Sequence, residues 1–247
     1  MKPMPPSLRK TLAILTVSLV KGQAAHLIWS LMESLRHTSI SVRSGKLDLE
    51  GVITSPAVIK DSPPGVVICH PHPLYGGDMD NPVVAAISHS LALSGIVSLR
   101  FNFRGVGGSQ GSFDNGKGEA KDLDAAMNFL TQWPGVDKSK IGVAGYSFGA
   151  MVLMSVLPAY PRARSFAIVS PPSGAVDRPL RFKVKSPTLF VVGEDDTQVR
   201  THTIRERVAG LKGDVRFHLV PRANHFWRGR EGEVAAIVSQ FFIDTLI

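Results

Sequence analysis

Apolar and polar residues follow two different patterns along the chain from Ser39 onward. Residues 39–42 and 46–54 alternate between apolar and polar and are joined by Ser44 and Gly45, which is typical of a β-hairpin. Continuous apolar runs follow, and each predicts a strand that is buried on both faces. These runs are residues 66–69, 96–101, 141–144, 166–169, 188–192 and 215–220.

Between these runs lie segments whose apolar residues recur at helical spacing. The first has a capping residue, Asp80 or Asn81, before Pro82, and Gly95 ends its pattern. The second has Glu119 near its start, where the helix dipole favours a carboxylate. Further helices are predicted over residues 148–157, 198–211 and 233–246.

This alternation of strands and helices sets the fold class. It predicts an α/β fold with a mostly parallel central sheet of about eight strands and helices on both faces. In such sheets, chemistry is found at the carboxyl ends of the strands. No repeat or linker interrupts residues 37–247, so we expect them to form a single domain.

Residues 1–36 differ from the rest of the chain. Three basic residues, the last of them Lys10, precede the apolar residues 11–20, and a second apolar run covers residues 22–32. Leucines at helical spacing predict an amphipathic helix that docks on the body of the protein or on a second copy. A signal peptide or a membrane anchor is the second interpretation, although neither run reaches the roughly 20 apolar residues that a spanning helix needs. A natural start at Met32 is the third.

These interpretations also decide where the protein is expected to act. We expect a cytoplasmic protein, with export or membrane association as the alternative if residues 1–36 act as a signal or an anchor. Contact with a membrane is expected through this segment only. Pairing of two copies into a homodimer stays open.

Composition excludes several classes of protein. The chain has 247 residues, of which 44% are apolar and 19% charged, with a single cysteine. The ordinary apolar fraction rules out disorder, and one cysteine cannot form a disulfide within the chain. The net charge of +8 is spread along the sequence, with loose basic clusters at 178–185 and 222–230 and no aromatic-rich RNA-binding signature interleaved with them. We therefore expect a soluble surface and no nucleic-acid partner.

The strongest chemical signal is the pentapeptide Gly-Tyr-Ser-Phe-Gly at residues 145–149. It lies directly between a predicted strand and a predicted helix. A serine on such a turn has its hydroxyl exposed, and small residues two positions to either side let the strand and the helix cross closely. The alternative, a glycine-rich turn with an idle serine, is weaker in this context. Ser147 is therefore the predicted nucleophile.

A serine nucleophile needs a base within hydrogen-bond reach and an acid that orients the base. The acidic residues 194–196 follow one predicted strand, and His225 follows the last one. Both lie just past the carboxyl end of a strand, at the edge where Ser147 emerges. The order serine, acid, histidine is that of one hydrolase architecture and differs from the trypsin-like and subtilisin-like orders.

These motifs resemble those of the α/β-hydrolases, specifically the small, lidless bacterial hydrolases related to dienelactone hydrolase and simple carboxylesterases. The resemblance extends over residues 39–247 and is carried by residues 69–77, 100–107, 145–149, 193–196 and 224–226. In this family the acid stands three residues after a glycine and three before an aliphatic residue. Asp196 matches that spacing better than Asp195, because Val199 follows it. Dienelactone hydrolase itself uses a cysteine nucleophile, whereas this chain has Ser147, so that particular activity is not expected.

Ester hydrolysis also needs two N–H donors for the oxyanion. The Phe148 N–H, at the start of the helix after the serine, is one, and the helix dipole assists it. The resemblance implies that the second donor lies in the loop after the first parallel strand, where the family carries a histidine-glycine or histidine-proline element. Pro71 and Pro73 have no N–H, which leaves His72, with Leu74 in reserve.

Two other motifs suggest cofactors, but neither pattern is complete. His70 and His72 have the close spacing of zinc ligands, yet residues 73–75 supply no companion ligand, and His70 is expected to brace neighbouring loops. The glycines at 105–108 are similar to a nucleotide-binding loop, but Gln110 stands where a third glycine should be. We expect neither a metal nor an organic cofactor.

The predicted reaction is acyl transfer from a small or medium ester to water. Residues 171–186, where the family commonly inserts a lid, are too few for a helical cap, which favours an open site and short acyl groups. Arg104 forms a structural ion pair or faces an acidic group of the substrate. The alternatives are an amidase or peptidase on the same fold and a non-catalytic binding protein that retains the fold.

Overall fold

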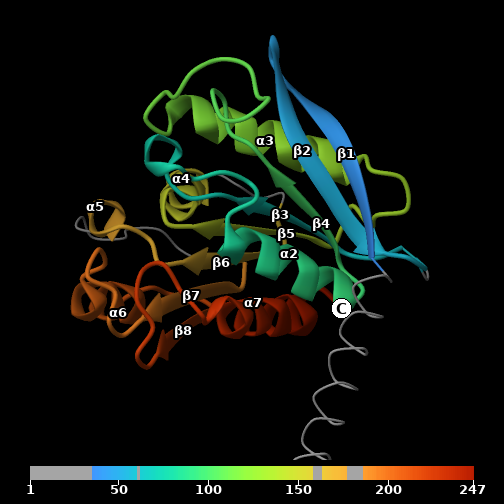
Figure 1. Cartoon of the computed structure of the whole chain (residues 1–247). Coiled ribbons are helices and arrows are strands. Elements are labelled where there is room, and N and C mark those ends of the chain that lie inside the picture. The colour runs from blue at the N-terminus through green and yellow to red at the C-terminus, as the bar shows by residue number, and fades with distance from the viewer. Residues whose placement is uncertain (1–34, 60–61, 158–162, 177–185) are drawn as a thin grey trace, which may run out of the picture.

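The computed structural model of the protein describes residues 35–59, 62–157, 163–176 and 186–247. Within them, an eight-stranded sheet has the order β1-β2-β4-β3-β5-β6-β7-β8 (Figure 1). Strands β1 (Leu35–Ser44) and β2 (Leu47–Pro56) form an antiparallel hairpin, and β2 also pairs antiparallel with β4. The remaining strands are parallel: β3 (Gly65–Cys69), β4 (Val97–Phe101), β5 (Ile141–Tyr146), β6 (Ser165–Val169), β7 (Thr188–Gly193) and β8 (Val215–Val220).

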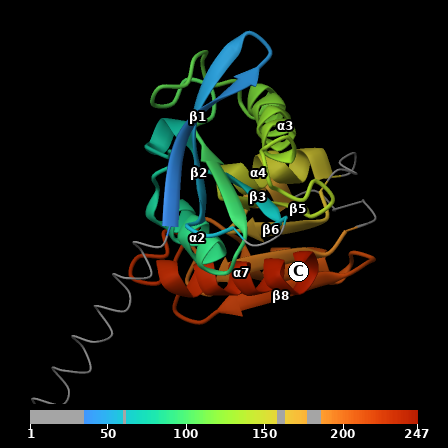
Figure 2. The ribbon, with the colours of Figure 1, turned by 90° about the vertical axis from the view of Figure 1, so that its right-hand side faces the viewer.

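Helices cover both faces of the sheet (Figures 1 and 2). On one face, α2 (Pro82–Leu93) packs beside α7 (Glu231–Leu246). The other face carries α3 (Lys117–Thr131), α4 (Phe148–Val156) and α6 (Thr201–Ala209). This arrangement confirms the predicted α/β fold with a mostly parallel sheet.

The apolar core has two layers, one on each face of the sheet. Successive residues of a strand point to opposite faces, so Val143 packs with α3 and α4 while Ala144 packs with α2 and α7. A close contact explains Gly142 in the same strand, since a Cβ there would lie 2.5 Å from a ring carbon of Phe242. The runs that predicted buried strands are therefore buried because helices cover both faces.

Strand β8 differs from its prediction. Its residues alternate between exposed and half-buried up to the fully buried Val220, instead of being buried throughout. Because β8 lies at the edge of the sheet and pairs only with β7, solvent reaches one side of the strand. Grouping residues 215–220 with the continuous apolar runs was wrong, because Arg216 and His218 alternate with the apolar residues and are the exposed positions.

Some elements begin or end at other residues than predicted, and two short helices were not predicted. Strand β1 begins at Leu35, so the last two residues of the predicted extension belong to the hairpin. Residues 1–34 lie outside the described residues. The docked helix, the signal peptide and the membrane anchor that were predicted for this segment therefore stay predictions. The 3-10 helix η1 (Pro73–Tyr75) and the short α5 (Ser173–Val176) were not predicted. Among the helices that the structure describes, none is both long enough and apolar enough to cross a membrane.

The topology brings distant parts of the sequence to one edge of the sheet. Strands β5, β7 and β8 are parallel, so their carboxyl ends lie on the same side. Ser147 follows β5, Asp196 follows the end of β7, and His225 follows β8. The order of strands therefore places the predicted serine, acid and histidine within reach of one another.

Candidate active site

Ser147 lies on a strained turn between β5 and α4. Its backbone angles are φ 53° and ψ −112°, in a region that residues with a side chain rarely adopt and that costs about 1–3 kcal/mol. Its N–H donates to the Val169 carbonyl at 2.9 Å, which ties the turn to β6. The surrounding structure thus holds the serine in a conformation that the isolated chain would avoid.

The two glycines of the pentapeptide are required by close packing. A Cβ on Gly145 would lie 2.5 Å from the carbonyl oxygen of Gly149, and a Cβ on Gly149 would lie 2.4 Å from that of Cys69. Both contacts are with backbone atoms, which cannot move aside as a side chain could. The glycines therefore allow α4 to cross β5 and β3 directly behind Ser147.

The predicted serine, histidine and acid meet through hydrogen bonds. The distance from Ser147 Oγ to His225 Nε2 is 3.0 Å, and His225 Nδ1 lies 2.9 Å from Asp196 Oδ2. Each of these residues is at most 9% exposed. With Nδ1–H donating to the carboxylate, Nε2 has a free lone pair that accepts from the serine hydroxyl. This arrangement allows the imidazole to take the proton of the serine.

The structure distinguishes Asp196 from its neighbour. Asp196 Oδ1 accepts hydrogen bonds from the backbone N–H groups of Gln198 and Val199, at 3.0 and 3.1 Å, and these bonds orient the carboxylate toward His225. Asp195 is exposed, and its own N–H donates to the Ala223 carbonyl at 2.9 Å. The geometry therefore agrees with Asp196 as the predicted acid.

Sequence reasoning missed the residues that hold the histidine loop. The Tyr146 hydroxyl donates to the His225 carbonyl at 2.7 Å, and burial raises the pKa of Tyr146, which keeps it a donor. A Cβ on Gly193 would lie 2.2 Å from the Ala223 carbonyl oxygen, so the end of β7 and the loop approach closely. Both residues lie within motifs that carry the family resemblance, residues 145–149 and 193–196, but no sequence signal assigned them this role.

The predicted oxyanion donors border the same site. Phe148 is the first residue of α4. The N–H of a first helical residue has no acceptor within the helix, so it can donate to a bound group. His72 and Phe148 line one cavity with Ser147, and their rings are 4.9 Å apart. The reserve candidate is already engaged, since the Leu74 N–H donates to His72 Nδ1 at 3.2 Å. The structure thus brings His72 and Phe148 to the serine, and their role stays a prediction.

A cavity of about 830 Å³ opens beside Ser147. Aromatic and other apolar side chains form much of its wall, among them Tyr75, Phe148, Met151 and Phe226. Tyr75 is 87% exposed and Phe226 is 54% exposed, so part of the cavity wall lies at the protein surface. Among the residues that the structure describes, this cavity leaves room for a substrate of moderate size beside the serine.

His70 braces two loops. Its fully buried ring donates from Nδ1 to the Pro71 carbonyl at 2.6 Å and accepts at Nε2 from the Phe103 N–H at 3.0 Å. Burial lowers the pKa of His70 to about 4, so the ring is neutral. Both ring nitrogens are engaged, which leaves none for a metal. In the part of the chain that the structure describes, no three potential ligands gather around one point.

Arg104 forms a structural ion pair. Its Nε and Nη2 donate to the two oxygens of Asp122 at 2.9 and 2.8 Å, and the Ser44 hydroxyl donates to the same carboxylate at 2.7 Å. Asp122 is fully buried, and its hydrogen bonds raise the pKa of Arg104. Of the two interpretations of Arg104, the structure selects the ion pair. The neighbouring glycine-rich loop is bound to the body of the protein by Glu50, which accepts from the Gly108 N–H at 2.8 Å.

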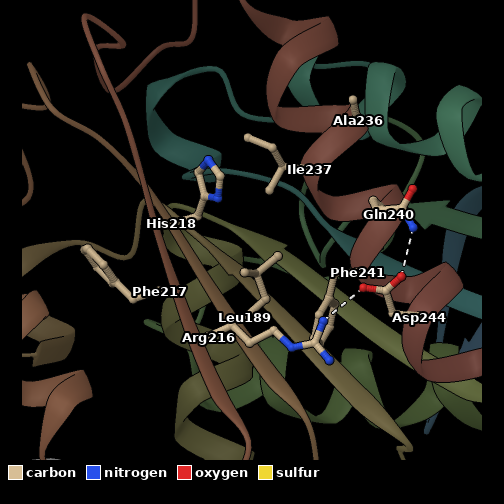
Figure 3. Close-up of a pocket in the computed structure, with 9 residues that line it drawn as sticks. All are labelled: Leu189, Arg216, Phe217, His218, Ala236, Ile237, Gln240, Phe241 and Asp244. Atoms are coloured by element: carbon tan, nitrogen blue, oxygen red, sulfur yellow. Dashed lines mark hydrogen bonds and ion pairs between the residues drawn. The ribbon is translucent and has the colours of Figure 1, made fainter.

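A second concavity lies between β8 and α7 (Figure 3). Its volume is about 490 Å³, and its wall includes Leu189, Ile237 and Phe241. Arg216 and Gln240 both bond to Asp244 there, at 3.0 and 2.8 Å, so the charges are paired (Figure 3). None of the predicted catalytic or oxyanion residues lines this concavity, and we assign it no chemistry.

Comparison with known proteins agrees with this fold. A model of the dienelactone hydrolase family matches residues 110–239. A Rickettsia prowazekii protein described as uncharacterized is 33% identical over 188 residues, which cover 73% of this chain and 79% of that protein. An alpha-beta serine hydrolase homologue from Coxiella burnetii is 34% identical, with a TM-score of 0.73, over 82% of this chain and 96% of that one.

A further solved structure bears on the open site. A serine hydrolase without a lid from Xanthomonas campestris is 26% identical, with a TM-score of 0.72, over 85% of this chain and 94% of that one. A dienelactone hydrolase from Anabaena variabilis, at 22% identity and a TM-score of 0.70, shares the fold. The chain therefore belongs to the dienelactone hydrolase family, within the α/β-hydrolases, and is a hydrolase.

Proposed function

We propose that this hydrolase cleaves carboxylic esters through a covalent acyl-enzyme formed on Ser147. One observation carries the proposal: a continuous line of hydrogen bonds runs from Ser147 Oγ through the His225 ring to Asp196, with distances of 3.0 and 2.9 Å. A serine hydroxyl is a weak nucleophile at neutral pH until such a base takes its proton. Ser147 and His225 also line a cavity that is large enough for an ester.

In the first half of the reaction, Ser147 Oγ attacks the ester carbonyl carbon while His225 Nε2 takes the hydroxyl proton. Asp196 holds the imidazole in the tautomer that can accept it and stabilises the imidazolium that forms. The carbon–oxygen bond to the alcohol then breaks, and His225 gives its proton to the departing alcohol oxygen. The products are a free alcohol and an acyl group on Ser147.

Water completes the cycle. His225 takes one proton from the water, whose oxygen attacks the acyl carbon, and the bond from that carbon to Ser147 Oγ breaks. The proton on His225 returns to the serine, so the enzyme is restored and a carboxylic acid leaves. Each tetrahedral intermediate carries an oxyanion, for which the N–H groups of Phe148 and His72 are the proposed donors. Such a donor is worth about 3 kcal/mol of transition-state stabilisation.

Open access to Ser147 supports small or medium esters with short acyl groups as substrates. Tyr75 and Phe226, both exposed, border the cavity, so a soluble ester can enter directly. A long acyl chain would extend beyond the cavity into solvent and would gain little from burial. Cleavage of dienelactone itself is not part of the proposal.

Matched substrates test this proposal. We expect p-nitrophenyl acetate and butyrate to be hydrolysed with higher kcat/KM than the laurate, and p-nitroacetanilide, the amide counterpart of the acetate, to be a far poorer substrate. Ser147→Ala should abolish turnover while its thermal unfolding matches that of the parent. Faster cleavage of the amide, or of long-chain triglyceride, would contradict the proposal. Folded protein that cleaves no ester would favour a binding protein.

A further inference from the structure

Phe226 is an exposed aromatic residue directly beside the proposed catalytic base. Its ring lies 5.6 Å from that of His225, centroid to centroid, in an edge-to-face arrangement with an interplanar angle of 89°. It lines the cavity that contains Ser147 and is 54% exposed. An aromatic ring thus forms part of the cavity wall on the side of the imidazole.

A tight turn holds the backbone of Phe226 in place. The Asn224 side chain accepts from the Phe226 N–H at 3.0 Å, and the Asn224 carbonyl accepts from the Trp227 N–H at 3.2 Å. Trp227 is fully buried, and its Nε1–H donates to Ser170 Oγ at 3.2 Å. Because Trp227 is anchored in the core, the backbone at Phe226 is fixed and its side chain leaves the chain at the surface.

A cation contributes to the position of the ring. The guanidinium carbon of Arg228 lies 5.5 Å from the centroid of the Phe226 ring, within the range of a cation–π contact. A side chain whose position is set before a ligand binds loses little conformational entropy on binding. Phe226 is therefore a preorganised apolar surface at the mouth of the cavity.

The chemistry of ester cleavage determines which part of the substrate lies there. The nitrogen that removes the serine proton, His225 Nε2, also returns a proton to the alcohol oxygen, so that oxygen must lie within hydrogen-bond reach of it. The oxyanion points elsewhere, toward the proposed donors on Phe148 and His72. The group attached to the alcohol oxygen therefore begins beside the imidazole, where Phe226 forms the wall.

We infer that Phe226 is a specificity-determining residue for the alcohol part of the ester, and that the enzyme prefers esters of aromatic alcohols to those of small alcohols. The inference rests on the proposed ester hydrolysis. Phe226 takes no part in proton transfer. It acts by covering the apolar group of the alcohol while the acyl group is transferred to Ser147, which raises kcat/KM for esters that carry such a group.

Methyl acetate and benzyl acetate test this inference. They share an acyl group, so deacylation is common to both, and their alcohols have nearly equal acidity. We expect the parent enzyme to favour the benzyl ester by roughly tenfold in kcat/KM, the effect of covering part of one ring. Phe226→Ala should bring the ratio of the two values close to that of the uncatalysed reaction, and Phe226→Leu should give an intermediate ratio.

Leu93→Ala is the matched control, because Leu93 is 47% exposed at the end of α2 and does not line the cavity. Its ratio should equal that of the parent. An unchanged ratio in Phe226→Ala would overturn the inference, and so would an equal loss for both esters, which would mean that the ring only positions His225. If the parent cleaves these esters and Ser147→Ala does not, the proposed ester hydrolysis is supported whatever the benzyl-to-methyl ratio of kcat/KM. Failure of the inference about Phe226 is therefore distinguishable from failure of the proposed function.

Discussion

At the scale of single residues, the two nitrogens of the His225 ring have different partners. Nδ1 donates to Asp196, and Nε2 accepts from Ser147. An asparagine in place of Asp196 would present its amide nitrogen or oxygen to Nδ1, and a donor there forces the proton onto Nε2. The imidazole would then have no lone pair for the serine proton.

Replacing the acid tests this asymmetry. We expect Asp196→Asn to lower kcat by about 10⁴-fold through the wrong tautomer. Asp195→Asn is the matched control and should lower kcat by less than about twofold, since Asp195 is exposed and contacts the loop through its backbone. Steady-state kinetics on one ester measures both, and the reverse ranking would assign the acid to Asp195.

His70 makes stability depend on pH. Its pKa falls from an ordinary value of 6.5 to about 4 on folding, because burial disfavours the charged ring. Between these values the unfolded chain binds more protons than the folded protein, so the free energy of unfolding falls as the pH is lowered. From pH 7 to pH 5 the group accounts for a loss of about 2 kcal/mol.

The variant His70→Gln isolates this contribution, because glutamine cannot titrate. In urea unfolding, the free energy of unfolding should fall from pH 7 to pH 5 by about 2 kcal/mol less in the variant than in the parent. Lost hydrogen bonds lower the stability of the variant at both pH values and cancel in the difference. An equal decline in the two proteins would show that His70 is not the group responsible.

At the scale of secondary structure elements, the crossing of α4 over β3 and β5 is the feature that exposes Ser147. Gly149 allows it, since a Cβ would lie 2.4 Å from the Cys69 carbonyl oxygen. For Gly232, in the first turn of α7, a Cβ would have no atom within 4 Å other than those of its chain neighbours and of the nearby backbone of its own helix. The two helical glycines therefore differ in their surroundings.

Alanine substitutions at these glycines should have opposite effects. Gly149→Ala should lower the free energy of unfolding by about 1–3 kcal/mol, because α4 must move away from β3. Gly232→Ala should raise it by about 0.5 kcal/mol, because alanine restricts the unfolded chain. Urea unfolding of both variants measures the difference. Equal stabilities would mean that the crossing tolerates a side chain.

Most elements were predictable because their patterns are strong and local. The alternation of the hairpin, the cap before Pro82 and the glycine-rich turn at Ser147 each depend on a few neighbouring residues. The exposed side of β8 could have been predicted from Arg216 and His218, which alternate with apolar residues, but its position at the edge depends on the strand order of the whole sheet. The 3-10 helix that begins at Pro73 has local signals that were missed, namely the proline at its first position and Gly76 with φ 77° after its end. The hydrogen bond from Tyr146 to the His225 loop depends on a tertiary contact that no local pattern records.

At the scale of the whole molecule, strand order converts three separate motifs into one site. Serine, acid and histidine are predictable as motifs, but the distances of 3.0 and 2.9 Å between them follow from the parallel pairing of β5, β6, β7 and β8. The family match and the fold make the protein a hydrolase. The ester chemistry that we propose adds one claim, that Ser147 forms the covalent bond to substrate.

Covalent labelling with a fluorophosphonate, read by mass spectrometry of the intact protein and of its peptides, tests that claim most directly. We predict one adduct per chain, on the peptide that contains Ser147, and no adduct in Ser147→Ala of equal thermal stability. Native, folded protein that remains unmodified, or an adduct on another residue, would contradict the account.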